Sequence, residues 1–123
     1  MTLSDIKHIL QAEVLYGEDN LDSQVVTGCA ADLMSDVLAF GFQDTIVITG
    51  LVNEQVILTA EMIDAAAVLF VRGKARQVSG RVLELAREKG IPVLVTNFLM
   101  FESCGLLYGA GLKACRYRDV QFV

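Results

Sequence analysis

The sequence predicts an α/β domain in which helices flank both faces of a mostly parallel sheet of about five strands. Between Thr45 and Thr96, short and almost entirely apolar runs alternate with segments of helical length. Each apolar run is followed by a polar or glycine-rich hinge. Strands buried on both faces of a parallel sheet have this continuous apolar character. At 123 residues, the chain is expected to form one domain, residues 1–123.

The first part of the chain combines one amphipathic helix with short strands. Leu3, Ile6 and Leu10 share one helical face, which Thr2 or Ser4 can cap. The elements expected here, in chain order, are a helix over Thr2–Leu10, a strand over Ala12–Tyr16, a turn over Gly17–Asn20, a strand over Gln24–Thr27 stopped by Gly28, and a helix over Ala31–Phe40 ended by a left-handed Gly41.

The second part carries the strand–helix alternation. Asn53 is a favourable first-turn cap, and Gly90 followed by Pro92 is a strong stop signal for a helix. The elements expected here are strands over Thr45–Gly50, Ala65–Val71 and Gly90–Val95, helices over Asn53–Ile63, Val78–Lys89 and Phe98–Ala110, the last capped by Asn97, and a terminal edge strand over Cys115–Val123.

Composition excludes several classes of partner and cofactor. The formal charge of −5 and the pI near 4.7 argue against binding to nucleic acid. No apolar run approaches the length that spans a membrane. The three cysteines lack CxxC spacing and His8 is the only histidine, so neither a metal nor another cofactor is expected. Without a signal peptide at the N-terminus, we expect free thiols in the cytoplasm.

The carboxyl ends of the strands are the expected place for a ligand, because open parallel sheets bind ligands there. Helix N-terminal amides together with Arg72 or Lys74 could hold a small anion. The same residues are also expected in βα turns that bind nothing, since such turns need glycines and caps. The candidate ligand-binding residues are Thr27, Gly28, Thr49, Gly50, Asn53, Arg72, Gly73, Lys74, Thr96 and Asn97.

Catalytic motifs are missing from the sequence. It contains no GxxxxGK[ST], GxGxxG, GxSxG or HExxH pattern, and no serine has a histidine to activate it. Asp32, Ser35 and Asp36 could form one polar face of a helix, which would be a solvated surface, a cation site or an acid–base pair. We therefore expect no enzyme, with a small enzyme using Asp32 and Asp36 as the less favoured alternative.

The last predicted helix is apolar nearly all round and carries one charge, Glu102. A helix without a polar face must be covered on both sides. In a chain of this size a partner subunit supplies the second cover most easily, so we expect a homodimer. The candidate interface residues are Phe98, Phe101, Gly105, Leu106, Leu107 and Tyr108.

The apolar pattern also supports a family resemblance. Its segments are Thr45–Gly50, Gln55–Ala60, Ala67–Gly73, Leu83–Ala86 and Gly90–Val95, followed by Phe101 and Glu102. Together they resemble a DRTGG domain. The part from Leu3 to Asp32 is similar to the related N-terminal domains of HPr kinase/phosphorylase and the Mur ligases. The Asp-Arg-Thr-Gly-Gly string itself is absent; the corresponding loops read Gly50–Asn53 and Arg72–Lys74.

The resemblance implies a non-catalytic regulatory or assembly module that is accessory to a metabolic or redox enzyme. Members of the family are inserted between CBS domains of some pyrophosphatases, where they contribute to subunit association. Others form part of some phosphotransacetylases or accompany iron hydrogenases. The resemblance carries no catalytic residue onto this chain. The alternative is a small-ligand sensor that binds a nucleotide or a phosphorylated metabolite at the strand ends.

Overall fold

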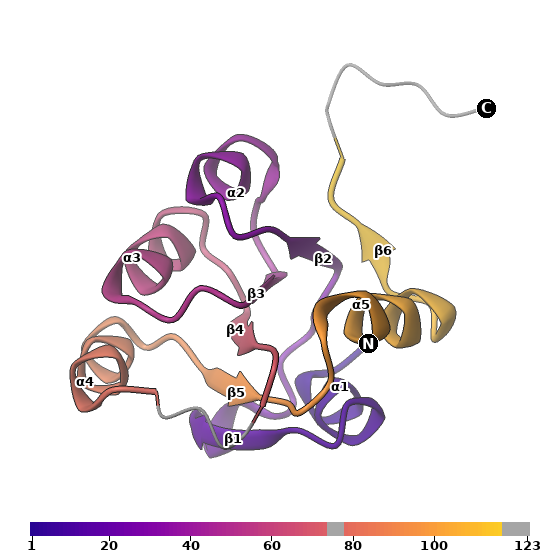
Figure 1. Ribbon diagram of the computed structural model, residues 1–123, viewed down its shortest axis with the longest axis horizontal. Coiled ribbons are helices and arrows are strands. Elements are labelled where there is room, and N and C mark those ends of the chain that lie inside the picture. The colour runs from indigo at the N-terminus through magenta and orange to yellow at the C-terminus, as the bar shows by residue number, and fades with distance from the viewer. Residues whose placement is uncertain (74–77, 117–123) are drawn as a thin grey trace.

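The protein folds as an α/β unit around a mostly parallel sheet, as the sequence predicts (Figure 1). The computed structural model describes residues 1–73 and 78–116. Within them, the elements in chain order are α1 (Leu3–Ile9), β1 (Glu13–Tyr16), the 3-10 turn η1 (Glu18–Asn20), β2 (Thr27–Ala30), α2 (Met34–Phe40), β3 (Thr45–Thr49), α3 (Glu54–Met62), β4 (Ala67–Phe70), α4 (Gly80–Lys89), β5 (Val93–Val95), α5 (Met100–Gly109) and β6 (Lys113–Ala114).

The strands form one six-stranded sheet in the order β1-β5-β4-β3-β2-β6. Only β1 among these strands runs antiparallel, pairing with β5 at one edge. The central strands β3 and β4 are buried along their whole length, which explains their continuous apolar sequences. The carboxyl ends of the parallel strands therefore meet at one edge of the molecule.

Helices cover the two faces of the sheet unequally. Figure 1 shows α2, α3 and α4 side by side on one face, and α1 and α5 on the other. The first core cluster contains Val37, Val56 and Val82 from the three helices, packed against alternate residues of the strands. The second contains Ile6 from α1 and Leu107 from α5, packed against the remaining strand residues. Both faces are thus buried, as a parallel sheet requires.

Two helices lie close to where the sequence predicts them, because their caps are local. The side chain of Asn53 accepts a hydrogen bond from the Val56 amide at 3.2 Å and starts α3. Ser79 does the same for Val82 at the start of α4, and Gly90 ends that helix with a φ of 69°. In α4, Val82 and Ala86 face inward while Arg81, Glu84, Arg87 and Glu88 are exposed.

The predicted strand over Gln24–Thr27 is wrong: β2 begins at Thr27, so Gly28 lies inside the strand instead of stopping it. A Cβ atom at position 28 would lie 3.1 Å from Leu112 Cδ2. Glycine at this position therefore allows Leu112 to pack closely on the strand. This contact joins residues far apart in the sequence, so local pattern could not reveal it.

The predicted start and end of the second helix are also wrong. α2 begins at Met34 instead of Ala31, because Asp32 reaches back to β3 with its side chain. Gly41 has a φ of −78° and is not left-handed. A Cβ atom at position 41 would lie 2.7 Å from Ile63 Cδ1 and from the Val37 carbonyl oxygen, so close packing explains this glycine.

The last helix begins two residues later than predicted, with Leu99 in place of Asn97 at its N-cap. The Phe98 amide donates to Thr96 Oγ1, and the Phe98 carbonyl accepts from the Arg72 amide at 2.9 Å. These bonds keep residues 96–98 in a turn.

At the other edge of the sheet, the predicted terminal strand is displaced to Lys113–Ala114, where β6 pairs in parallel with β2. Most of the predicted range, residues 117–123, lies outside the described residues. Among the residues that the structure does describe, no helix is long and apolar enough to cross a membrane.

Candidate functional site

Asp32 and Thr49 form the centre of a polar cluster at the carboxyl ends of β2 and β3. One oxygen of the Asp32 carboxylate accepts hydrogen bonds from Thr49 Oγ1 at 2.9 Å and from the Gly50 amide at 2.8 Å. Thr49 Oγ1 also accepts from the Leu51 amide at 3.1 Å. These bonds fix the turn that leads from β3 toward α3. We call Asp32, Thr49, Gly50 and Arg72 the strand-end cluster.

Arg72 brings a cation to the same cluster from the end of β4. Its guanidinium lies over Gly50 and donates from Nη2 to the Gly50 carbonyl at 3.4 Å. A Cβ atom at position 50 would lie 3.1 Å from Arg72 Nε, so glycine leaves room for the guanidinium. The backbone of Arg72 is left-handed, with a φ of 75°, and the side chain is exposed.

The electrostatics of the cluster follow from these contacts. The hydrogen bonds from the Gly50 amide and from Thr49 lower the pKa of Asp32, and the positive charge of Arg72 lowers it further. Asp32 is therefore ionised at neutral pH. An anionic ligand at this cluster would meet the exposed guanidinium of Arg72 as a hydrogen-bond donor, with the Asp32 carboxylate nearby.

The other predicted ligand residues do not all reach this cluster. Thr27 and Gly28 lie at the opposite end of β2 or within it, and Thr27 hydrogen-bonds to Thr45 at the amino ends of the strands. Thr96 is fully buried and donates to the Leu10 carbonyl at 2.7 Å.

Three further predicted positions have local roles in the backbone. Asn53 caps α3, and Gly73 donates its amide to the Thr96 carbonyl. Asn97 is exposed beside the turn, and Lys74 lies outside the described residues. The structure thus brings together Thr49, Gly50 and Arg72, with Gly73 adjacent in sequence.

Asp32 is the member of the cluster that sequence reasoning placed elsewhere. We expected it on a helical face with Ser35 and Asp36, but it precedes α2, and its carboxylate is directed to β3. A usable signal was present, because a carboxylate directly follows the small-residue segment 28–31. Reading that segment as a strand end would have placed Asp32 at the carboxyl end of a strand, although not beside Thr49 in particular.

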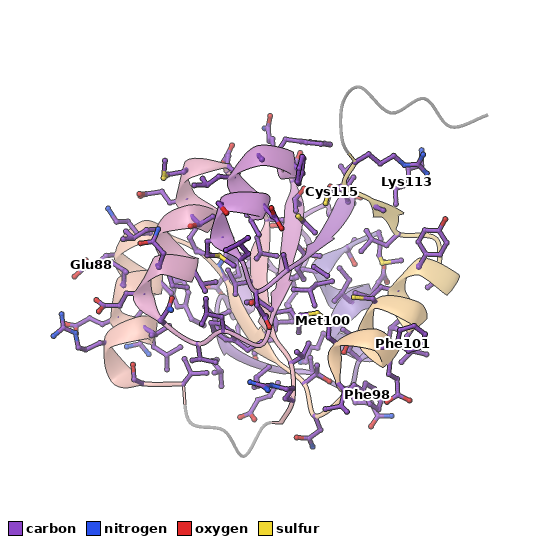
Figure 2. All side chains as sticks on the ribbon, turned by 45° about the horizontal axis from the view of Figure 1, so that its top comes forward. Glu88, Phe98, Met100, Phe101, Lys113 and Cys115 are labelled. Carbon is purple, nitrogen blue, oxygen red and sulfur yellow. The ribbon has the colours of Figure 1, made fainter. Side chains whose placement is uncertain are left out.

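The second candidate site is the outer side of α5, which we call the α5 face: Leu99, Phe101, Gly105, Leu106, Tyr108 and Gly109. Phe101 is 92% exposed and Tyr108 is 66% exposed. Figure 2 shows Phe101 on the outer side of α5 and Met100 toward the sheet. Gly105 and Gly109 have open space where a Cβ would stand. Two other predicted interface residues face inward, since Leu107 is 1% exposed and Phe98 packs partly on the core.

An apolar groove runs beside the α5 face, between α5 and the strands β2 and β6. Its volume is about 440 Å³. Phe101, Cys104 and Tyr108 line one side, and Ala114 and Cys115 line the other. The only charged side chain lining this groove in the described part of the chain is Lys113.

Metal binding finds no support in residues 1–73 and 78–116, where no group of three or more histidine, cysteine, aspartate or glutamate side chains could hold an ion. The cysteines at positions 29, 104 and 115 are present as free thiols.

Comparison with known families gives one match by sequence. A family model described as the DRTGG domain matches residues 5–108. No curated protein matches the chain.

Comparison with solved structures gives a match by fold. The chain is similar to the crystal structure of the CBS and DRTGG domains of the regulatory region of Clostridium perfringens pyrophosphatase, complexed with an activator, diadenosine tetraphosphate. The TM-score is 0.69 and the identity is 20%, over 98% of this chain and 52% of that chain. The present chain thus spans about half of the similar structure, and at this identity the likeness shows the fold.

Proposed function

Because the chain belongs to the DRTGG domain family, we propose that it is a non-catalytic regulatory module that binds a second copy of itself through the α5 face. In this function it is accessory to a metabolic or redox enzyme, whose activity lies on another chain or domain. The fold neighbour supports the regulatory part of this proposal, since its own description is that of a regulatory region.

The exposure of Phe101 is the observation that carries the proposal. A phenylalanine that is 92% exposed, on a helix with a single charge, leaves a large apolar area in contact with water. Tyr108 and Leu106 extend this area along the same helix. Contiguous apolar surface rimmed by polar residues marks interaction sites on soluble proteins.

The arrangement of large and small residues favours a second copy as the partner. Phe101 and Gly109 are equally far from Gly105 along α5. A two-fold axis at Gly105, with the helices antiparallel, therefore places Phe101 of each copy over Gly109 of the other. Open space above both glycines allows the helices to approach closely. Such a self-complementary contact is the usual basis of a symmetric dimer.

The apolar area is large enough to sustain a dimer when the costs of association are ordinary. Removal of roughly 500 Å² of apolar surface from water contributes on the order of 12 kcal/mol at about 25 cal/mol per Å². The loss of translational and rotational freedom costs about 4–15 kcal/mol, so the quality of packing around Phe101 decides the affinity.

Phe101→Glu tests this function. We expect wild-type protein to have a dimer mass by light scattering across a dilution series, and Phe101→Glu to raise the dissociation constant about a hundredfold or more. Because Phe101 makes few contacts within its own chain, the variant should unfold at the same temperature as wild-type protein diluted until it is monomeric.

Met62→Glu is the matched control, since Met62 is 69% exposed at the end of α3, on the opposite face of the sheet. It should leave the dimer intact. A wild-type chain that stays monomeric at high concentration, or equal effects of the two variants, would contradict self-association through α5.

A second candidate function is the sensing of a small phosphorylated ligand at the strand-end cluster. It is favoured by the exposed guanidinium of Arg72 at the carboxyl ends of parallel strands. The similar structure is described as a complex with diadenosine tetraphosphate, which makes that dinucleotide the first ligand to try.

Isothermal titration with diadenosine tetraphosphate tests this candidate. Loss of one charge-assisted hydrogen bond in Arg72→Ala should raise the dissociation constant about tenfold or more. Arg87→Ala, which removes an exposed arginine from the last turn of α4, should not change it. No heat of binding for the wild type, or equal losses in both variants, would rule out this ligand at this cluster.

A further inference from the structure

Cys29 and Cys115 are opposite one another on neighbouring strands. The register of β2 and β6 pairs Thr27 with Lys113 and Gly28 with Ala114. The next pair in this register is Cys29 with Cys115. The Cys115 amide also donates to the Gly28 carbonyl at 3.0 Å, so the two strands still run together at this point. Adjacent strands are about 4.8 Å apart, within the range of Cα separations that a disulfide bridges.

The two thiols contact each other directly, and their exposures differ. Each side chain is a hydrogen-bond partner of the other. Cys29 is 3% exposed within the core beneath α2, whereas Cys115 is partly exposed at the edge of the sheet and packs against the same core cluster. A reagent can therefore reach Cys115 from solvent, and Cys29 only through Cys115.

The pKa values of the two thiols are shifted in opposite directions. The hydrogen bond from Cys29 lowers the pKa of Cys115, which favours a thiolate at the exposed position. The same bond and burial raise the pKa of Cys29. Asp36 on α2 is the charged group that acts on Cys29, and Lys113 lies two residues before Cys115 along the chain.

We propose that Cys115 is a modification site for low-molecular-weight disulfides, with Cys29 as the resolving thiol that closes a Cys29–Cys115 disulfide. This inference rests on the protomer alone and is independent of the proposed self-association.

The reaction consists of two thiol–disulfide exchanges. The Cys115 thiolate attacks one sulfur of the small disulfide, a Cys115–sulfur bond forms, the sulfur–sulfur bond of the reagent breaks, and one small thiolate leaves. Cys29 then loses its proton to solvent, and its sulfur attacks Cys115 Sγ and expels the second small thiolate into solvent. Two protein thiols are oxidised, and one small disulfide is reduced to two thiols.

Cys104 is the internal comparison. It lines the apolar groove from α5, and burial raises its pKa. Because Cys104 lies on neither β2 nor β6, the strand register does not place it opposite another cysteine. It is therefore expected to react slowly, and Cys104→Ser should leave the reaction of the pair unchanged.

The experiment treats the full chain with excess oxidised glutathione and reads intact mass and peptide maps under denaturing, non-reducing conditions. We expect wild type and Cys104→Ser to lose two hydrogens and to yield one linked peptide pair containing Cys29 and Cys115. Cys29→Ser, which keeps a hydrogen-bond donor but lacks the resolving sulfur, should instead accumulate one glutathione on Cys115.

Cys115→Ser provides a second test that does not depend on the folding of Cys29→Ser, since position 115 is only partly buried. It should form no disulfide within the chain and should take up glutathione at least tenfold more slowly than the wild type. The proposal is overturned if Cys104→Ser stays reduced, if it forms only cross-links between chains, or if Cys115→Ser reacts as fast as the wild type.

Discussion

At the scale of the residue, Asp32 holds the end of β2 against the end of β3. Its carboxylate accepts from the side chain of Thr49, the last residue of β3, and from the Gly50 amide in the turn that follows. The same turn leads into α3 and supports the guanidinium of Arg72. A change at Asp32 therefore affects local stability and the placement of Arg72 together.

Asp32→Ala is expected to lower the free energy of unfolding by about 1 kcal/mol at pH 7, since it removes two hydrogen bonds to a charged but exposed acceptor. The folded-state pKa of Asp32 lies below its unfolded value of 3.8. The contribution is therefore fully present above that value and is lost as the pH falls through the folded-state pKa. Urea titrations at several pH values measure it.

Asp36→Ala is the control for this prediction, because Asp36 is an exposed carboxylate in the first turn of α2. A loss in Asp36→Ala as large as that in Asp32→Ala, or a loss in Asp32→Ala that persists at the lowest pH, would contradict the role given to Asp32.

Single residues also show what sequence can reveal of the site. Thr49, Gly50 and Arg72 were predicted because they directly follow strands whose apolar runs are easy to recognise. Asp32 was misplaced because β2 is built from small residues and lacks such a run. The contact between Asp32 and Thr49 depends on pairing between β2 and β3, which no local pattern specifies.

At the scale of the element, α5 is stable through one face and available for contact through the other. Leu107 and the buried Ser103 face the sheet, while the α5 face points away from it. A helix divided in this way can tolerate changes on its outer face without loss of the fold.

Gly105→Gln tests this division. A Cβ at position 105 meets nothing within 4 Å in the protomer. Glutamine favours helix more than glycine does, so the free energy of unfolding should rise by about 0.5 kcal/mol. The same side chain fills the space through which a second helix would approach, so the dimer dissociation constant should rise about tenfold or more.

Measurement in the Phe101→Glu background separates the two effects of Gly105→Gln, because unfolding is then followed without self-association. Light scattering on the single variant reports the dimer. A Gly105→Gln chain that dimerises as well as the wild type would place the interface elsewhere.

Elements also differ in how far sequence predicts their boundaries. α3 and α4 were predicted within a few residues because Asn53, Ser79 and Gly90 act on their own backbone neighbours. The starts of β2 and α5 were wrong because they depend on distant partners. Leu112 packs on Gly28, and Arg72 binds the Phe98 carbonyl.

At the scale of the whole molecule, the class of fold was predictable and the order of the strands was not. Continuous apolar runs identify parallel strands. The order β1-β5-β4-β3-β2-β6 depends on the side of the sheet on which each connecting segment crosses. It also depends on the placement of β1 and β6 at opposite edges. Those choices are made by packing across the full chain.

Closure of the Cys29–Cys115 disulfide should stabilise the whole molecule. The bridge would close most of the chain into one loop and destabilise the unfolded state by about 4–5 kcal/mol through lost entropy, before any strain. We expect the melting temperature of the oxidised protein to exceed that of the reduced protein by roughly 15 °C. Calorimetry with and without reductant measures the shift, and Cys29→Ser should show none.

The left-handed backbone at Arg72 affects which residues selection would favour at this position. A side chain at a φ of 75° costs about 1–2 kcal/mol relative to a right-handed conformation, a penalty that glycine escapes. Selection for stability alone would replace Arg72 with glycine, which gives up one weak hydrogen bond to the Gly50 carbonyl. Under the proposed ligand sensing, Arg72→Gly would therefore favour thermal stability and weaken binding, so that the two properties would select different residues at this position.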